Sequence, residues 1–204
     1  MYTVVSEEKE GMIMGRTKEF DHEQVLHKAM LVFWEKGYEA TSIPDLVKAM
    51  GISRSSMYET FVDKETLYVQ AFKHYKRVWE KKRTLLRQAT SVKEGVRQYF
   101  EMHIAGAYDE AYPKGCLVTN TIVSADSPHQ EFHQLTRESL NELERIFYEL
   151  LKKGQQSGEI GPDKDIKVLA SLLLHLNHGI NVMARSTSDR KAAEDMIAAV
   201  IEML

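Results

Sequence analysis

The sequence predicts an all-α protein of about nine helices, and three observations support this fold class. Only four prolines and eleven glycines interrupt the 204 residues. The frequent residues Leu, Ala, Met, Lys and Glu are good helix formers. Apolar side chains also recur at intervals of three and four residues, and Ser or Asp residues stand where helix N-termini need capping groups.

Residues 1–14 have no amphipathic period and contain a cluster of Glu and Lys, so we expect a disordered N-terminal arm. A second interpretation is that translation begins at Met14, which would leave a short basic arm. In that arm Arg16 and Lys18 are candidates for contacts with the minor groove or backbone of DNA. The first helix is expected to begin at an Asp21 cap and to run to Gly37.

Residues 37–67 predict two short helices around a glycine turn, followed at once by a third helix. Ser42 can cap the first short helix together with Asp45, in a capping box. Gly51 supplies the left-handed residue that ends this helix at little cost. A second short helix over 54–60 follows. This spacing is typical of a helix-turn-helix, whose second helix enters the DNA major groove.

The side chains expected to face DNA divide into base readers and phosphate binders. Arg54 can make a bidentate contact with guanine, whereas Tyr58 and Lys64 are suited to phosphates, which fix register. The alternative is that Tyr58 packs at a helix junction and that Lys64 is only a solvated charge. The candidate DNA contacts are Thr41, Ser42, Ser53, Arg54, Ser55, Tyr58, Glu59 and Lys64.

A helix-turn-helix DNA-binding domain is expected over 15–63 and a larger helical domain over 64–204. Capping boxes at Ser91 and at Ser127 mark two helix starts in the second domain, and Pro113 helps to break the chain between them. The basic run 76–87 is interpreted as a solvated helix face. The expected segments are 64–90, 91–107, a short apolar segment 116–125, 127–150, a loop 152–165, and final helices 163–185 and 188–204.

The first quarter of the chain resembles the TetR/AcrR family of bacterial transcriptional regulators. The resemblance rests on GYEATS, MGIS, RSSMYETF and DKETL, and covers about residues 15–70. The fragment PKGCLVTNTIVSAD at 113–126 is similar to a GCL segment of one subgroup. The resemblance implies a homodimeric, ligand-responsive repressor that dimerises through its last two helices. Its partners would be a near-palindromic double-stranded DNA operator, a second copy of the chain and an unknown small-molecule effector.

Polar and aromatic residues on otherwise apolar helix faces are the candidates for an effector cavity in the second domain. More often such residues are satisfied groups of a core or a dimer interface, and this alternative stays open. The candidates are Tyr99, Met102, His103, Cys116, Asn120, Phe147, His175 and His178. The apolar face expected for dimerisation comprises Leu169, Leu172, Leu173, Leu176, Ile180, Met183, Met196, Ile197, Val200 and Ile201.

Cys116 is the single cysteine of the chain, so no intramolecular disulfide forms and a reducing cytoplasm fits. A helix start at this position would favour its thiolate, and the resemblance implies electrophile or redox sensing there. The alternative is a small buried hydrophobic residue.

Other classes of function have weaker support. No catalytic motif is present, which predicts a protein that is not an enzyme and needs no cofactor. His129 and His133 have metal-ligand spacing but no third ligand, so no metal site is expected. A helical adaptor or a small metal-binding protein remains the alternative. The net charge of −3 still allows a local basic surface, and no apolar run approaches the roughly 20 residues that would span a membrane.

Overall fold

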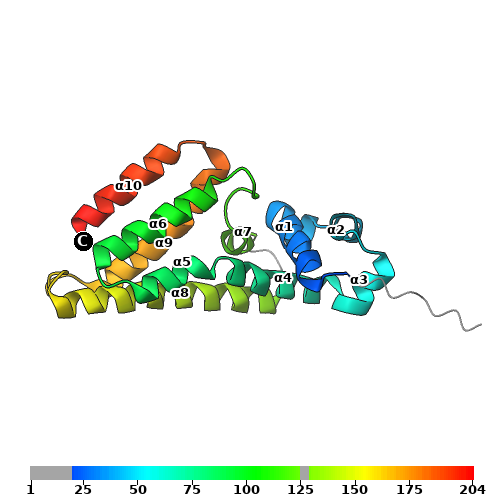
Figure 1. The fold of residues 1–204 in the computed structure, drawn as a ribbon, viewed down its shortest axis with the longest axis horizontal. Coiled ribbons are helices and arrows are strands. Elements are labelled where there is room, and N and C mark those ends of the chain that lie inside the picture. Colours follow the sequence, from blue (N-terminus) through cyan, green and yellow to red (C-terminus); the bar gives the residue numbers. More distant parts are fainter. Residues whose placement is uncertain (1–19, 125–128) are drawn as a thin grey trace, which may run out of the picture.

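The computed structural model describes residues 20–124 and 129–204, and every regular element in these ranges is a helix, which confirms the all-α prediction (Figure 1). The predicted arm 1–14, Arg16, Lys18 and the predicted helix start at Ser127 lie outside the described residues. The helices are α1 His22–Ala40, α2 Ile43–Met50, α3 Arg54–Phe61, α4 Lys64–Val78, α5 Glu80–Gln88, α6 Val92–Ala107, α7 Leu117–Val123, α8 Gln130–Ser157, α9 Ile166–Ser186 and α10 Arg190–Met203.

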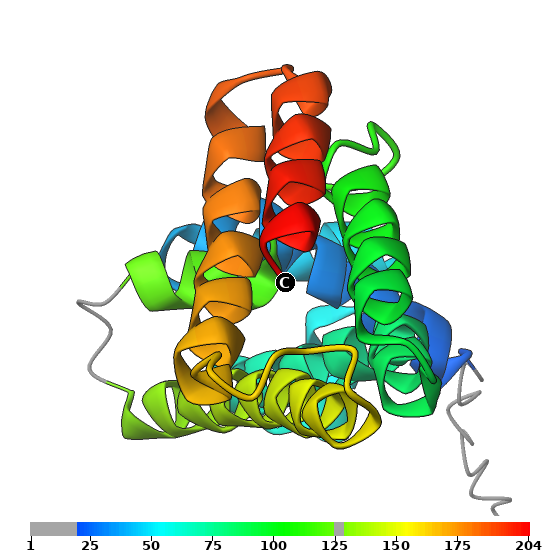
Figure 2. The same cartoon turned by 90° about the vertical axis from the view of Figure 1, so that its left-hand side faces the viewer.

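The helices form a small three-helix end and a larger helical body. Helices α1, α2 and α3 lie together at one end of the molecule, and α4 followed by α5 runs from this end along α8 (Figure 1). At the other end α10 packs on α6, and α9 packs on both α6 and α8 (Figure 2). Helix α7 contacts α1 on one side and α8 and α9 on the other. The connection between the two ends therefore runs through α4, α5 and α7.

Two apolar cores correspond to these two parts. The first contains buried side chains of α1 to α4, among them Phe33, Met57 and Phe72, and it also takes in Leu117 of α7 and Phe132 of α8. The second contains buried side chains of α5, α6, α8, α9 and α10. Because α7 and the start of α8 contribute to the first core, a shift in the body can be transmitted to the three-helix end by direct packing.

The capping signals around α2 are confirmed. The Ser42 hydroxyl accepts a hydrogen bond from the Asp45 N–H over 3.2 Å, and the Asp45 carboxylate accepts one from the Ser42 N–H over 3.0 Å. A Lys36 side chain that donates to the same carboxylate, with help from Ser42, holds the pKa of Asp45 far below its usual range. Gly51 ends the helix with φ of 72°. Interactions between residues close in the sequence therefore define both ends of this helix.

The turn between α3 and α4 has a conformation that the sequence did not predict. Val62 adopts φ of 66° and ψ of −60°, and the Asp63 N–H donates to the Phe61 carbonyl over 2.7 Å. These angles and this bond define a γ-turn of the rare, positive-φ type. Val62 is the one non-glycine residue with positive φ in the described part of the chain. A β-branched side chain at such an angle stores backbone strain.

Two predicted boundaries are wrong. The single helix expected over 64–90 is broken at Trp79, which separates α4 from α5. The Trp79 indole packs against the rings of Trp34 and Tyr112, at 6.3 and 5.7 Å between ring centroids. The apolar period continues through the break, so the sequence pattern does not reveal it. The loop expected over 152–165 begins later, because α8 extends to Ser157 and ends at Gly158 with φ of 80°.

The expectation that no segment is long and apolar enough to cross a membrane is also wrong, when length and composition are the only criteria. Among the described residues, the 21-residue helix α9 meets both conditions, with a mean hydropathy of 1.2 over an 18-residue window. Only 33% of that window is buried inside the molecule. A core helix of a soluble protein meets the same conditions, so the finding mainly shows that α9 presents an apolar face that the chain does not cover.

Candidate nucleic-acid interface and interior polar cluster

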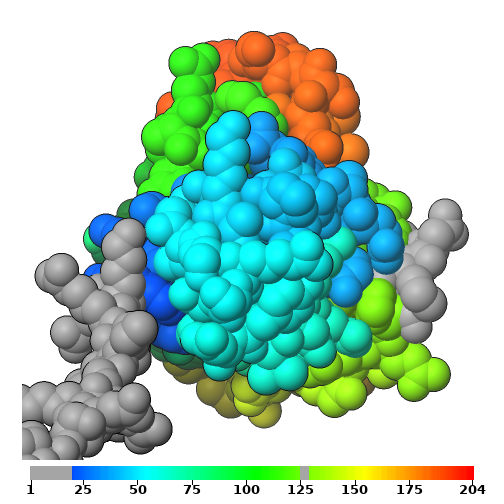
Figure 3. All heavy atoms as spheres, turned by 90° about the vertical axis from the view of Figure 1, so that its right-hand side faces the viewer, coloured from blue at the N-terminus to red at the C-terminus, as the bar shows by residue number. Residues whose placement is uncertain are grey.

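Helix α3 is anchored on one face and open on the other. Its Met57 and Phe61 side chains are fully buried in the first core. The Ser53 hydroxyl caps its N-terminus by accepting from the Ser56 N–H over 3.0 Å. Figure 3 views this end of the molecule, with α2 and α3 across the exposed face. A short, capped helix held from behind in this way can present its outer side chains to a groove.

The outer face of α3 carries the side chains predicted to read DNA. Arg54, Ser55, Tyr58 and Glu59 are all exposed. The Arg54 guanidinium lies over the Tyr58 ring, 5.6 Å from its centroid, and forms no ion pair with a carboxylate among the described residues. It therefore keeps its donors available for a planar acceptor such as a guanine edge. Ser53 is exposed as well but shares its hydroxyl with two neighbouring serines.

Lys64 occupies the first position of α4, next to this face. Its ammonium lies 4.3 Å from the centroid of the Tyr38 ring, which ties α4 to the end of α1. Partial burial lowers the pKa of Lys64, and Glu39 opposes this effect. Lys64 is only half-buried, so its ammonium can serve both as a cation over Tyr38 and as a phosphate contact.

Thr41 departs from the prediction that its hydroxyl meets a phosphate. Its side chain is 1% exposed, and the hydroxyl donates to the Gly37 carbonyl over 2.6 Å. The hydroxyl completes the end of α1, which is why it turns inward. Ser42 is exposed, but its hydroxyl is engaged as the cap of α2.

The predicted effector residues are only partly brought together. Tyr99, His103 and Phe147 meet inside the body, with the Tyr99 and His103 rings stacked at 6.0 Å and Tyr99 edge-on to Phe147 at 5.2 Å. His178 lies in the same interior network through a 2.8 Å hydrogen bond between its Nδ1 and the Thr119 hydroxyl.

Cys116 and Asn120 lie on the side facing the three-helix end. The Asn120 amide donates to the Trp34 carbonyl over 3.0 Å, and the Tyr75 hydroxyl donates to the Cys116 sulfur over 3.1 Å. Burial, together with Cys116, raises the pKa of Tyr75 well above its usual value. Cys116 is 8% exposed, so its side chain is buried as part of the first apolar core.

His175 and Met102 do not join this cluster. His175 is exposed on the outer face of α9, where its Nδ1 bonds to the Ser171 carbonyl over 2.6 Å. Met102 is half-buried on α6. The helix period assigned these two residues to an apolar helix face. That period shows neither how the helix curves nor which helices pack against it.

Sequence reasoning missed Lys82 and Arg83, because the basic run 76–87 was interpreted as solvated. Arg83 is 6% exposed and donates to the Lys76 carbonyl and to Glu80. The Lys82 ammonium donates to His103 Nδ1 over 3.0 Å and lies 5.4 Å from the Trp79 ring centroid. Burial lowers the pKa of Lys82 to about 8. These cations could have been assigned to the interior only if the helix break at Trp79 had been known, and the sequence pattern does not show that break.

A small cavity of about 10 Å³ lies where the three-helix end meets the body. This volume is close to the space that one water molecule occupies. Its lining comes from seven parts of the chain: Trp34, Tyr75, Trp79, Lys82, His103, Gly106, Ala107, Gly115 and Asn181.

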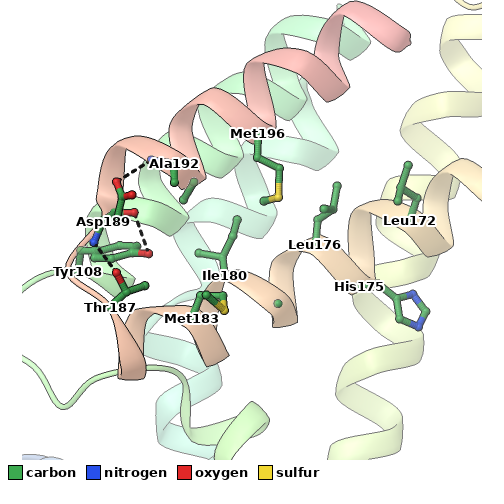
Figure 4. Close-up of a pocket in the computed structure, with 12 residues that line it drawn as sticks. Tyr108, Leu172, His175, Leu176, Ile180, Met183, Thr187, Asp189, Ala192 and Met196 are labelled. Atoms are coloured by element: carbon green, nitrogen blue, oxygen red, sulfur yellow. Dashed lines mark hydrogen bonds between the residues drawn. The ribbon is translucent and has the colours of Figure 1, made fainter.

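A much larger apolar hollow of about 530 Å³ lies on the outer side of α9 and α10. Leu172, Leu176, Ile180, Met183 and Met196 point into it, and Tyr108 and Thr187 close one end (Figure 4). Several members of the predicted dimerisation face lie elsewhere, because they are buried within the protomer: Leu173, Ile197 and Ile201. The large apolar side chains that α9 and α10 do expose are Val168, Leu172, Val182, Met183, Met196 and Met203.

Comparison with known proteins matches the N-terminal and the C-terminal parts of the chain to regulators of one family. Residues 25–71 match the model of bacterial regulatory proteins of the tetR family, and residues 93–200 match a tetracyclin repressor-like C-terminal domain. The chain is 33% identical to the uncharacterised HTH-type transcriptional regulator YezE of Bacillus subtilis, over 94% of this chain and 100% of the relative. It is 34% identical to the HTH-type transcriptional repressor ComR of Escherichia coli, over 84% and 82% of the two chains.

A solved structure of a TetR family regulator, a cysteine mutant of CifR bound to 26-base-pair operator DNA, superposes with a TM-score of 0.83. The two chains share 28% identity, over 92% of this chain and 98% of the other.

Proposed function

The chain belongs to the TetR family of bacterial transcriptional regulators, and we propose that it is a homodimeric repressor released from its operator by a small-molecule effector. This family consists of DNA-binding regulators and not of enzymes. The observation that carries the proposal is the outer face of α3, where four exposed side chains stand on a helix anchored by Met57 and Phe61. Such a protein would act in the cytoplasm, where its DNA is.

In this proposal the domain over 15–63 reads DNA and the domain over 64–204 binds effector and partner. Arg54 reads a base, while Tyr58 and Lys64 hold the register on phosphates. Ser53, Ser55 and Glu59 line the same contact. Thr41 is left out, because its hydroxyl is buried and used by α1.

Two copies would place their α3 helices in successive major grooves of a near-palindromic operator, about 34–36 Å apart. The exposed apolar side chains of α9 and α10 support a dimer built on these helices, because a monomer would leave them in water. The structure of a CifR mutant on operator DNA supports the DNA partner.

The effector would bind among Tyr99, His103, Phe147, Asn120 and His178 and favour a spacing of the two α3 helices that no longer matches the grooves. Switching of this kind requires that the effector bind the DNA-free state more tightly, and the coupling is reciprocal.

The test is binding of the purified protein to the promoter fragments that flank its own coding region, followed by footprinting of the bound fragment. Specific binding is expected to fall steeply with salt and to exceed nonspecific binding by about 10³ or more. Arg54→Ala should lower operator affinity by about tenfold or more and relax base preference at one position. Arg145→Ala, which removes an exposed arginine from α8 of the body, is the matched control. Unchanged affinity and preference in Arg54→Ala would overturn the assignment of the reading residue.

A further inference from the structure

The small cavity between the three-helix end and the body is lined by hydrogen-bond donors that lack acceptors. Trp34 from α1 and Trp79 from the α4–α5 break both line it, and the indole Nε1 of each is buried without a partner. Lys82 lines it as well, and its ammonium forms no ion pair with a carboxylate in the part of the chain that the structure describes. The residues that line this space therefore include two with unpartnered indole N–H groups and one ammonium without a carboxylate partner.

The neighbouring acceptors are already used. The Lys82 ammonium donates to His103 Nδ1, so His103 carries its proton on Nε2 and donates to the Asn177 carbonyl over 2.9 Å. The Asn177 side-chain oxygen accepts from the Tyr99 hydroxyl over 2.9 Å. The acceptors of this network are neutral groups, so they do not balance the Lys82 charge.

A second chain of bonds ends at a buried ring nitrogen. The Thr119 hydroxyl accepts from the Asn181 amide over 3.2 Å and shares a 2.8 Å hydrogen bond with His178 Nδ1. The other ring nitrogen, His178 Nε2, is buried and has no partner. Among the described residues the buried side-chain atoms without a partner are three ring nitrogens and one acceptor, the Asn120 Oδ1. Two of these four atoms, the indole nitrogens of Trp34 and Trp79, can only donate.

We propose that this cavity binds the carboxylate group of the effector, with Lys82 as its counter-ion and the Trp34 and Trp79 indoles as hydrogen-bond donors. The inference rests on the proposed function and names the chemical class of its ligand. A planar carboxylate accepts from several donors at once and supplies the negative charge that the site lacks. Arg83, the group best suited to a phosphate, already donates to Lys76 and Glu80.

Binding at this point acts on the joint between the two parts of the molecule. At about 10 Å³ the cavity holds no more than one water molecule, so a carboxylate enters only if its walls move apart. The walls include Trp34 on α1, Gly106 on α6 and Trp79 at the break between α4 and α5. Gly106 and the Trp79 ring pack closely, since a Cβ added at Gly106 would lie only 3.1 Å from that ring. Because α1 belongs to the DNA-binding end, the wider state has a different placement of α3.

The two tryptophans of the chain both line this cavity, so intrinsic fluorescence reports on it directly. The experiment titrates the full-length protein, without DNA, with the sodium salts of straight-chain acids from acetate to octanoate at constant ionic strength. The primary amides of the same chain lengths are the neutral probes. The acids are expected to change the fluorescence saturably, and the amides are expected to bind about tenfold more weakly or not at all.

Three variants locate the site. Lys82→Met should weaken binding of the acids by about tenfold or more, and it should fold, because a buried charge is replaced by an apolar chain of similar length. Lys81→Met, an exposed change one residue away on α5, should bind as the wild type does. Trp79→Phe removes one donor and keeps Trp34 as reporter, and it should weaken the acids several-fold.

Equal binding of acids and amides, or unchanged binding of acids to Lys82→Met, would overturn the inference, as would the lack of any saturable response to the whole series. A parallel measurement of operator binding separates this failure from that of the proposed function. If the protein binds its operator but no acid acts through Lys82, the repressor function is supported and the carboxylate site is wrong. If the acids bind through Lys82 but no promoter fragment binds specifically, the carboxylate site is supported and the repressor function is wrong.

Discussion

The Lys82 ammonium donates a hydrogen bond to His103 Nδ1 over 3.0 Å and so joins α5 to α6 inside the protein. Burial lowers the pKa of Lys82 to about 8, and burial together with the Lys82 charge lowers the pKa of His103 well below its usual value. At neutral pH the pair therefore carries one positive charge, and that charge resides on the lysine. Its removal has consequences for stability as well as for ligand binding.

Lys82→Met should stabilise the protein at pH 7 and remove a pH dependence. The folded-state pKa of Lys82 is lowered, so between about pH 8 and the unfolded value near 10.4 the unfolded chain binds more protons. The stability of the wild type therefore rises with pH in this window, by about 3 kcal/mol at most. Urea unfolding at pH 7 and pH 10 measures both effects. If the variant shows the same rise as the wild type, Lys82 is not the group that titrates.

Val62→Gly should stabilise the folded state by about 1 kcal/mol. Glycine adopts φ of 66° without the steric cost that a β-branched residue meets there, and this gain exceeds the added entropy of the unfolded chain. Val62 is 69% exposed, so little packing is lost. Val123→Gly is the matched control, since Val123 is 65% exposed in α7 with ordinary helical angles, and it should be neutral or destabilising. A destabilised Val62→Gly would mean that the turn needs its side chain.

Glu159 connects the end of α8 to the start of α6, and its replacement should show a clear pH signature. Its carboxylate accepts from the N–H groups of Val92 and Lys93 over 2.8 and 2.9 Å. Burial acts against the charged form, but these bonds and the Ser91 hydroxyl still hold the pKa of Glu159 below its usual value. A lowered pKa means stability that is present above the unfolded value and is lost as the pH falls through the folded value.

Glu159→Gln should therefore cost about 1 kcal/mol at pH 7, and the difference from the wild type should shrink as the pH drops below about 4. Thermal or urea unfolding across pH 3–7 is the measurement. Glu101→Gln, an exposed change on α6, should leave stability unchanged at each pH. A cost that does not depend on pH would show that shape, and not charge, makes Glu159 important.

The DNA-binding end could be predicted closely because short-range interactions determine it. The Ser42 and Asp45 cap, the Gly51 turn and the inward Met57 all depend on residues a few positions apart. The Val62 turn could not be predicted, because valine disfavours that angle.

The body could be predicted less well because its site depends on contacts far apart in the sequence. Lys82 meets His103 across 21 positions and Tyr99 meets Asn177 across 78. A periodic pattern identifies an apolar face but not the helix that covers it. For that reason His175 was assigned to the cavity although it lies outside, and Lys82 was assigned to solvent although it lies inside.

Met183→Glu should weaken the proposed dimer. Met183 is 55% exposed and points into the apolar hollow of α9 and α10, so a dimer built on these helices would bury one new carboxylate from each copy. Sedimentation velocity should show a shift from dimer to monomer, and operator affinity should fall with it. Val123→Glu, an exposed change on α7, should stay dimeric. A dimeric Met183→Glu would place the interface elsewhere.

Cys116 offers the test of the alternative in which a thiol senses electrophiles or oxidants. The sulfur is 8% exposed and accepts a hydrogen bond from the Tyr75 hydroxyl over 3.1 Å, so a reagent reaches it only when α7 moves away from α4. Ellman titration of the native protein should therefore be about tenfold or more slower than that of the urea-unfolded protein. Tyr75→Phe should speed the native reaction if that bond helps to hold the thiol in place. A native thiol that reacts as fast as the unfolded one, in a protein that then loses its operator, would favour Cys116 as the sensor over the carboxylate site beside Lys82.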